Sequence, residues 1–280
     1  MVFIDSSVFG GEVGVLVWSK RGRVIAWIIA AVLFGVIYGL PIATIALASI
    51  SGQWNSILPS QLTARHYAQA LQGDSAQQLW VSVLMGALAS GAALISGTWA
   101  ALALRSIDAK RRRVLDVLFF MPSAVPSVSV GLGLLVAFSR PPIVLNGTPY
   151  IVFIAHFVLI SAFCYGNVAA GLARLPLDYE QVAQSLGARP FYRLTRITLP
   201  LLTPYLIAAF SLSFALSMGE LGATLMIYPP GWVTLPVGIF ALSDRGAVFD
   251  AATLTMILGA TTLVVLMALS RISNKAMVRS

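Results

Sequence analysis

Long apolar stretches separated by short polar segments dominate this sequence. A helix needs about 20 predominantly apolar residues to cross the hydrocarbon core of a bilayer. Backbone groups inside hydrocarbon must be satisfied within the helix itself, and the short alternating stretches of a barrel strand are missing. The pattern therefore predicts six membrane-spanning helices, over residues 24–50, 79–104, 114–138, 150–173, 201–225 and 248–269.

The polar segments between these stretches divide the chain into parts. The loop after the first span is long and polar, and a short helix is expected near residues 64–71. The segment 227–247 follows a Pro-Pro-Gly turn with apolar residues, which is typical of a turn plus a short or re-entrant helix. We expect an all-α integral membrane protein with an N-terminal segment at 1–23, a first span at 24–50, a periplasmic loop at 51–78, a core of five spans at 79–270 and a tail at 271–280.

Composition agrees with lipid as the solvent for much of the chain. Apolar residues make up 58% of the sequence and charged residues 10%, whereas about a quarter of a soluble domain is charged. The single cysteine, Cys164, cannot form an internal disulfide, and no cluster of metal-ligating residues stands out. The chain is therefore expected to bind no metal and no cofactor.

Basic residues gather on one predicted side of the membrane. All but three of the 18 Lys and Arg residues lie before the first span, in the second or fourth loop, or in the tail. Cytoplasmic segments of membrane proteins carry such an excess, so both termini and the loops 105–113 and 174–200 are predicted to be cytoplasmic. This rule explains the net charge of +8 better than nucleic-acid binding does, and no nucleic-acid partner is expected.

Motifs for enzymatic chemistry are missing from the sequence. It has no G-x4-G-K-[ST] phosphate loop, so we expect no ATP hydrolysis by this chain alone. No arrangement of catalytic residues is evident either. An ion-coupled secondary transporter would be expected to have paired inverted repeats and clustered intramembrane acids, and neither is found.

The loop 174–200 contains a short helix framed on both sides. Asp178 is suited to cap its start with Gln181 three residues later, Gly187 suits the left-handed position after its end, and Pro190 prevents continuation. A helix of about eight residues is too short to be stable alone, so it needs a surface to pack on. Its apolar stripe could pack on the protein's own helix ends or dock on a cytoplasmic partner; the stripe consists of Tyr179, Val182, Ala183 and Leu186.

This loop resembles the signature loop of ATP-binding-cassette (ABC) importer permeases, written E-A-A-x3-G-x9-I-x-L-P. The spacing from Gly187 to Ile197, Leu199 and Pro200 matches, whereas Gln181 and Val182 replace the usual Glu and Ala, and Glu180 lies one residue early. The resemblance implies a coupling helix that sits in a groove of a separate ATPase subunit. Its residues here would be Asp178, Tyr179, Glu180, Gln181, Val182, Ala183, Leu186, Gly187, Ile197, Leu199 and Pro200.

A second resemblance extends over most of the chain. The segments Met121-Pro122-Ser123-Ala124-Val125-Pro126 and Met218-Gly219-Glu220-Leu221-Gly222-Ala223-Thr224 are similar to type I importer permeases for oxyanions, iron, thiamine and phosphonates, and most similar to those for 2-aminoethylphosphonate. The resemblance implies a six-helix type I permease in a bacterial inner membrane. It also implies a second permease chain, identical or different, two ATPase subunits and a periplasmic solute-binding protein. Thiamine, iron or an oxyanion remains an alternative cargo.

Polar and helix-breaking residues within the spans are candidates for the translocation path. An ionisable group in a span is costly and therefore a functional candidate. Glu220 could line the path, anchor a helix or lie solvated at the interface, and His156 could be a structural hydrogen-bonding residue or a proton relay. The prolines of the third span suit either a water-filled path or a packing kink. The path candidates are Pro122, Ser123, Pro126, Ser127, Gly219, Glu220, Gly222 and Thr224.

Overall fold

The computed structural model describes residues 20–176 and 178–279, most of which are helical. The predicted N-terminal segment 1–23 lies largely outside the described residues. In chain order the elements are α1 (Lys20–Phe34), η1 (Gly35–Gly39), α2 (Leu40–Ser49), β1 (Ser51–Gln53), β2 (Gln61–Leu62), α3 (Arg65–Ala70), α4 (Gly73–Arg105), α5 (Ala109–Phe120), η2 (Met121–Ala124), α6 (Ser127–Ala137), α7 (Pro149–Arg174), α8 (Asp178–Ser185), α9 (Pro190–Arg193), η3 (Leu194–Thr198), α10 (Leu199–Met218), α11 (Gly222–Ile227), α12 (Leu235–Asp244) and α13 (Val248–Arg279).

The chain forms two units, residues 1–47 and 48–280. The described part of the first unit is helical, and its large apolar side chains are exposed, as lipid-facing residues are. This helix continues to Ser49 and is long and apolar enough to cross a membrane. The five-residue π segment η1, bounded by Gly35 and Gly39, interrupts its regular α-helical bonding.

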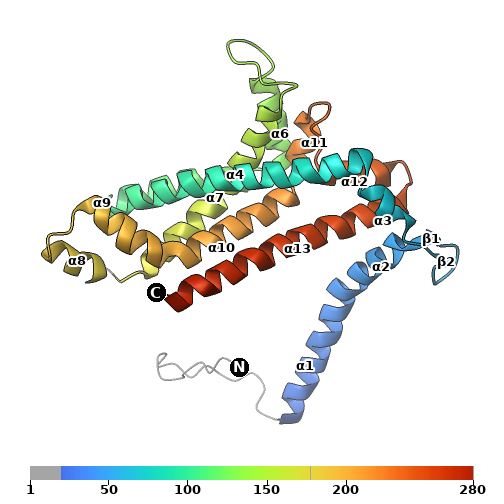
Figure 1. The fold of residues 1–280 in the computed structure, drawn as a ribbon, viewed down its shortest axis with the longest axis horizontal. Coiled ribbons are helices and arrows are strands. Elements are labelled where there is room, and N and C mark those ends of the chain that lie inside the picture. The colour runs from blue at the N-terminus through green and yellow to red at the C-terminus, as the bar shows by residue number, and fades with distance from the viewer. Residues whose placement is uncertain (1–19, 177, 280) are drawn as a thin grey trace. The chain divides into compact units, whose positions relative to one another are not determined.

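Three long helices, α4, α7 and α10, form the core of the second unit, and α13 lies alongside α10 (Figure 1). Small residues of α4 let the backbones approach closely: Ala89 and Ala93 are fully buried, and a Cβ at Gly97 would lie 3.1 Å from the Tyr165 backbone nitrogen. The small-residue stripe of α4 therefore packs within the chain.

The two ends of the second unit carry different elements. The short helix α8, the last residues of α4 and the end of α13 lie toward one end, and α3 and α12 lie toward the other (Figure 1). Three segments that the charge pattern places on one side of the membrane are thus grouped in space. Their cytoplasmic placement stays a prediction.

Four predicted spans are confirmed as long helices. The range 24–50 corresponds to the continuous helix Lys20–Ser49, which ends one residue earlier, and the ranges 79–104, 150–173 and 248–269 fall within α4, α7 and α13. The short outer helix expected near 64–71 is α3, and the short helix expected within 227–247 is α12. The first turn of α12 is buried, which explains why its sequence is too apolar for a free loop.

The third predicted span is not one straight helix. The range 114–138 is divided between α5, η2 and α6, and the helices on the two sides of the break meet at 94°. Val125 is extended, with a ψ of 133°, because the ring of Pro126 disfavours the helical conformation in the residue before it. Five described helices can each cross a membrane by length and composition, and the bent pair can supply the sixth span.

The fifth predicted span, 201–225, is wrong at its end. The helix α10 closes at Met218, and α11 begins at Gly222. Between them, the Glu220 carboxylate accepts a hydrogen bond from the Ala223 N–H at 2.8 Å, which satisfies a free donor in the first turn of α11. A single apolar stretch therefore contains two helices, because a polar side chain supports a new start within it.

Candidate coupling helix and membrane cavity

The short helix α8 ends in the way that its glycine predicts. Gly187 has a φ of +83°, in the left-handed region. Its N–H donates to the Gln184 carbonyl at 2.9 Å, and the Ala188 N–H donates to the Ala183 carbonyl at 3.0 Å. These two bonds form a Schellman motif, which satisfies carbonyls that the end of a helix leaves free. Pro190 then starts α9 as its first residue, which needs no N–H donor.

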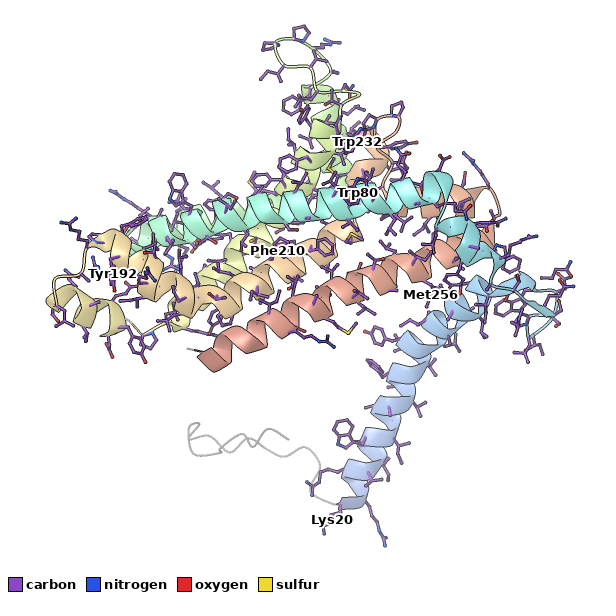
Figure 2. All side chains as sticks on the ribbon, viewed as in Figure 1. Lys20, Trp80, Tyr192, Phe210, Trp232 and Met256 are labelled. Atoms are coloured by element: carbon purple, nitrogen blue, oxygen red, sulfur yellow. The ribbon has the colours of Figure 1, made fainter. Side chains whose placement is uncertain are left out.

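The apolar stripe of α8 is exposed. Tyr179 and Val182 are each more than half exposed, and Leu186 is 82% exposed. These three side chains therefore do not pack on the helix ends of this chain, which was one of the two alternatives, and Ala183, the fourth residue of the stripe, is partly buried. It borders a hollow of about 460 Å³ that reaches Tyr192 on α9 (Figure 2) and is lined by Ala183, Leu186, Gly187, Ala188, Arg189 and Tyr192.

A neighbouring face of α8 is bonded to the membrane helices through Glu180. One carboxylate oxygen, Oε1, accepts hydrogen bonds from the Arg105 guanidinium and from the Thr198 hydroxyl, each at 2.8 Å. Partial burial would raise the pKa of Glu180, but the Arg105 and Thr198 hydrogen bonds and the nearby positive charges hold it below its usual 4.5. In the sequence, Arg105 contributed only to the excess of basic residues that predicts the cytoplasmic side, and no local pattern pairs it with α8.

The remaining motif residues lie in the helix that follows the loop. Ile197 belongs to the π segment η3, and Leu199 and Pro200 begin α10, so the three lie in one continuous helix, Pro190–Met218. Pro200 has no N–H to donate, which agrees with irregular bonding in the preceding turn. Gln181, at the position where the family has Glu, is exposed.

A cavity of about 230 Å³ lies where α6, α7 and α10 meet. Three path candidates, Ser123, Ser127 and Glu220, line it together with His156 and Ser217, which the sequence did not place on the path. The other candidates do not line this cavity: Pro122, Pro126, Gly219, Gly222 and Thr224. The apolar part of its wall consists of Val125, Leu159, Ile160, Phe163 and Leu216.

His156 joins three helices beside this cavity. It is 1% exposed, and its ring nitrogens hydrogen-bond with the Ser217 hydroxyl at 2.6 Å and the Thr224 hydroxyl at 2.9 Å. The bonds connect α7 to the end of α10 and to α11. Both ring nitrogens are thus engaged with hydroxyls, which favours the structural role over the proton relay.

Glycines bring α6 and α11 into close contact. A Cβ at Gly131 would lie 2.7 Å from the Cα and carbonyl oxygen of Ala223, closer than real contacts allow. A Cβ at Gly222 would collide with the Ser127 hydroxyl oxygen. The two short helices next to the cavity can therefore pack only with glycine at these positions.

One acidic residue in the third predicted span was not singled out by the sequence pattern. Asp116 lies in α5 and accepts a hydrogen bond from the hydroxyl of the buried Tyr165, and Arg112 lies 3.9 Å away. Tyr165 stacks on Phe119 with ring centroids 4.6 Å apart. The sequence could have indicated a role for Asp116, because an acidic residue within an apolar stretch needs a partner.

Comparison with known proteins gives a consistent result. A family model described as binding-protein-dependent transport system inner membrane component matches residues 93–280. PhnV of Salmonella paratyphi A, a permease protein whose name assigns it to 2-aminoethylphosphonate transport, is 55% identical over 260 residues, 93% of this chain and 98% of PhnV. PotI of Escherichia coli K12, a putrescine transport system permease protein, is 31% identical over 212 residues, 72% of this chain and 74% of PotI.

Solved structures share the fold. A chain of a bacterial ABC transporter that imports the acidic polysaccharide alginate matches with a TM-score of 0.74 and 16% identity, over 91% of this chain and 96% of that one. A chain of the MetNI methionine ABC transporter in an inward-facing conformation matches with a TM-score of 0.61 and 15% identity, over 72% of this chain and 95% of that one. At these identities the likeness concerns the fold alone.

Proposed function

Because this chain belongs to the family of binding-protein-dependent transport system inner membrane components, we propose that it carries 2-aminoethylphosphonate into the cell. It is a multi-pass permease subunit of an ABC importer in a bacterial inner membrane. The observation that carries the cargo proposal is the 55% identity to PhnV, which extends over nearly the whole of both chains.

The assembly comprises this chain, a second permease chain, identical or different, two ATPase subunits and a periplasmic solute-binding protein. This chain has no phosphate loop, so the ATPase subunits supply ATP hydrolysis. The solute-binding protein delivers cargo to the outer ends of the spans. The excess of basic residues in these segments supports a cytoplasmic position for α8, where it can reach the ATPase.

Coupling is mechanical and passes through α8. Its exposed apolar stripe, with Leu186 at its end, docks into a groove of an ATPase subunit and removes apolar surface from water. Closure of the ATPase subunits on ATP then displaces α8. The displacement moves the helices to which α8 is attached and so alternates access to the path.

The cavity beside Glu220 is a segment of the translocation path. Hydroxyls of Ser123 and Ser127 and the carboxylate of Glu220 offer polar contacts to a small zwitterion, and half of the lining residues are apolar. Such a mixture suits a transient site, because cargo must leave as readily as it enters.

The docking proposal is tested with L186D in the assembled importer. A charge placed on the apolar stripe should release the ATPase subunit during purification and abolish uptake. The matched control is S185D, which adds the same charge to an exposed polar position of the same helix. An L186D importer that keeps its ATPase and imports cargo at the control rate contradicts docking through this face.

The cargo proposal is tested by titrating the solute-binding protein with 2-aminoethylphosphonate, phosphate, thiamine, ferric iron and putrescine. Tight binding of the aminophosphonate alone, with uptake of the same compound by the reconstituted importer, is the expected result. Tight binding of another compound in its place would overturn the assignment.

A further inference from the structure

The attachment of α8 to the membrane helices is concentrated in one carboxylate. Glu180 reaches the end of α4 through Arg105 and the last residue of η3, directly before α10, through Thr198, and all three side chains are partly or largely buried. A further side-chain hydrogen bond from α8, which the Arg193 guanidinium donates to the side-chain amide oxygen of Gln184, is exposed and joins α8 to the neighbouring helix α9.

These contacts separate two functions on different faces of an eight-residue helix. The side chains of Tyr179, Val182 and Leu186 are exposed, whereas the carboxylate of Glu180 is bonded to Arg105 at the end of α4. The two partners of Glu180 belong to helices that pack on each other in the core. A displacement of α8 is therefore passed to α4 and α10 together.

We propose that Glu180 is the positioning residue that transmits movement of the coupling helix to α4 and α10, so that its loss uncouples ATP hydrolysis from import while leaving the ATPase docked. The proposal rests on the proposed function, because it needs α8 to be the site where the ATPase acts.

Charge and geometry make this link stiff. A hydrogen bond between ionised partners is shorter and stronger than a neutral one, and an Arg–carboxylate pair is directional. Thr198 adds a second bond to the same oxygen, so α8 cannot rotate about the Arg105 contact without breaking it. The lowered pKa of Glu180 keeps the carboxylate ionised at neutral pH.

The experiment compares E180A with Q184A in the full importer reconstituted with its ATPase and solute-binding protein. Both variants remove one hydrogen-bonding side chain from α8, but the bond of Gln184 is exposed and joins α8 to α9 instead of to α4 and α10. Three quantities are measured: the ATPase retained by the purified complex, ATP hydrolysis, and 2-aminoethylphosphonate imported per ATP. In E180A we expect retained ATPase and a loss of at least about fivefold in cargo per ATP, the lower end of typical coupling between sites.

A charge exchange distinguishes a transmitting pair from a merely structural one. The double variant E180R/R105E restores an ion pair between α4 and α8, and the Thr198 hydroxyl can accept a hydrogen bond from the guanidinium introduced by E180R. We expect it to recover most of the cargo imported per ATP that E180A loses, whereas R105E alone should be as uncoupled as E180A.

Three results overturn the proposal. The first is an E180A importer with the same cargo per ATP as Q184A. The second is loss of the ATPase subunit from E180A, because docking would then depend on Glu180 too. The third is a charge exchange that recovers nothing. If the ATPase subunit stays bound to the L186D importer, the proposed docking fails. If L186D releases the ATPase subunit but E180A has no effect on cargo per ATP, docking stands and the transmission role of Glu180 fails.

Discussion

Substitution of Gly187 tests whether the ordered end of α8 matters for transport. The residue has a φ of +83°, and a Cβ built on it would meet no atom within 4 Å. Replacement therefore adds no steric clash with the rest of the protein. Its whole effect acts through the backbone, on the Schellman bonds that end the helix.

The magnitude follows from the cost of the left-handed conformation. An L-residue with a Cβ pays about 1–2 kcal/mol there, which lowers the population of the correctly ended helix about 5- to 30-fold. Asparagine tolerates this conformation better than alanine, and a β-branched residue tolerates it worse. We expect import to fall in the order Gly, Asn, Ala, Val, because a helix of this length has little stability to spare.

The assay is uptake of 2-aminoethylphosphonate by proteoliposomes that contain the assembled importer, together with ATPase activity stimulated by the loaded solute-binding protein. G187N, G187A and G187V are compared with G133A, which adds a Cβ in equally open space within a regular helix and so controls for substitution itself. Equal uptake and equal stimulation in all four proteins would refute the reasoning, because the backbone at Gly187 would then be irrelevant to coupling.

Three further predictions concern packing, the buried histidine and pH. G131A should lower the melting temperature in detergent by an amount equivalent to about 1–3 kcal/mol, because its Cβ meets the Ala223 backbone, whereas G133A should not; equal melting temperatures would contradict the contact. H156F should leave two buried hydroxyls unpaired and destabilise the protein by about 1–3 kcal/mol for each, as measured by thermal unfolding in detergent; an unchanged melting temperature would contradict this. Because the pKa of Glu180 is lowered, its carboxylate stays ionised and bonded to Arg105 and Thr198 above the ordinary value of 4.5, and the bonds weaken only below that value. The ratio of wild-type to E180Q import should therefore be constant between about pH 6 and 8. A ratio that changes with pH in this range would contradict the lowered pKa.

The ends of α8 were predictable because local physics determines them. Gly187 and Pro190 restrict the backbone at their own positions, and the apolar stripe repeats with the period of a single helix. The structure begins α8 at Asp178, where the sequence placed the cap, and Leu177 lies outside the described residues. A difference of one residue at a helix start is within the usual variation of such assignments.

The partners of Glu180 were not predictable in the same way. Arg105 is 75 positions away, and nothing in the pattern around either residue encodes the pairing. The prolines of the third span indicated a kink, but the size of the bend was not predictable. Apolar content over a long window indicates a span, but one proline can turn the chain within it, and the conformation of Val125 decides the direction.

The contact between α6 and α11 has a consequence for engineering the cargo range. Gly131 and Gly222 leave no space for even one methyl group, so the two short helices tolerate little change where they meet. The apolar wall contributed by α7 and α10 carries larger side chains that can be shortened, among them Leu159, Phe163 and Leu216. Libraries aimed at bulkier aminophosphonates should vary this wall and keep both glycines, because larger residues at the glycine contact would destabilise the protein.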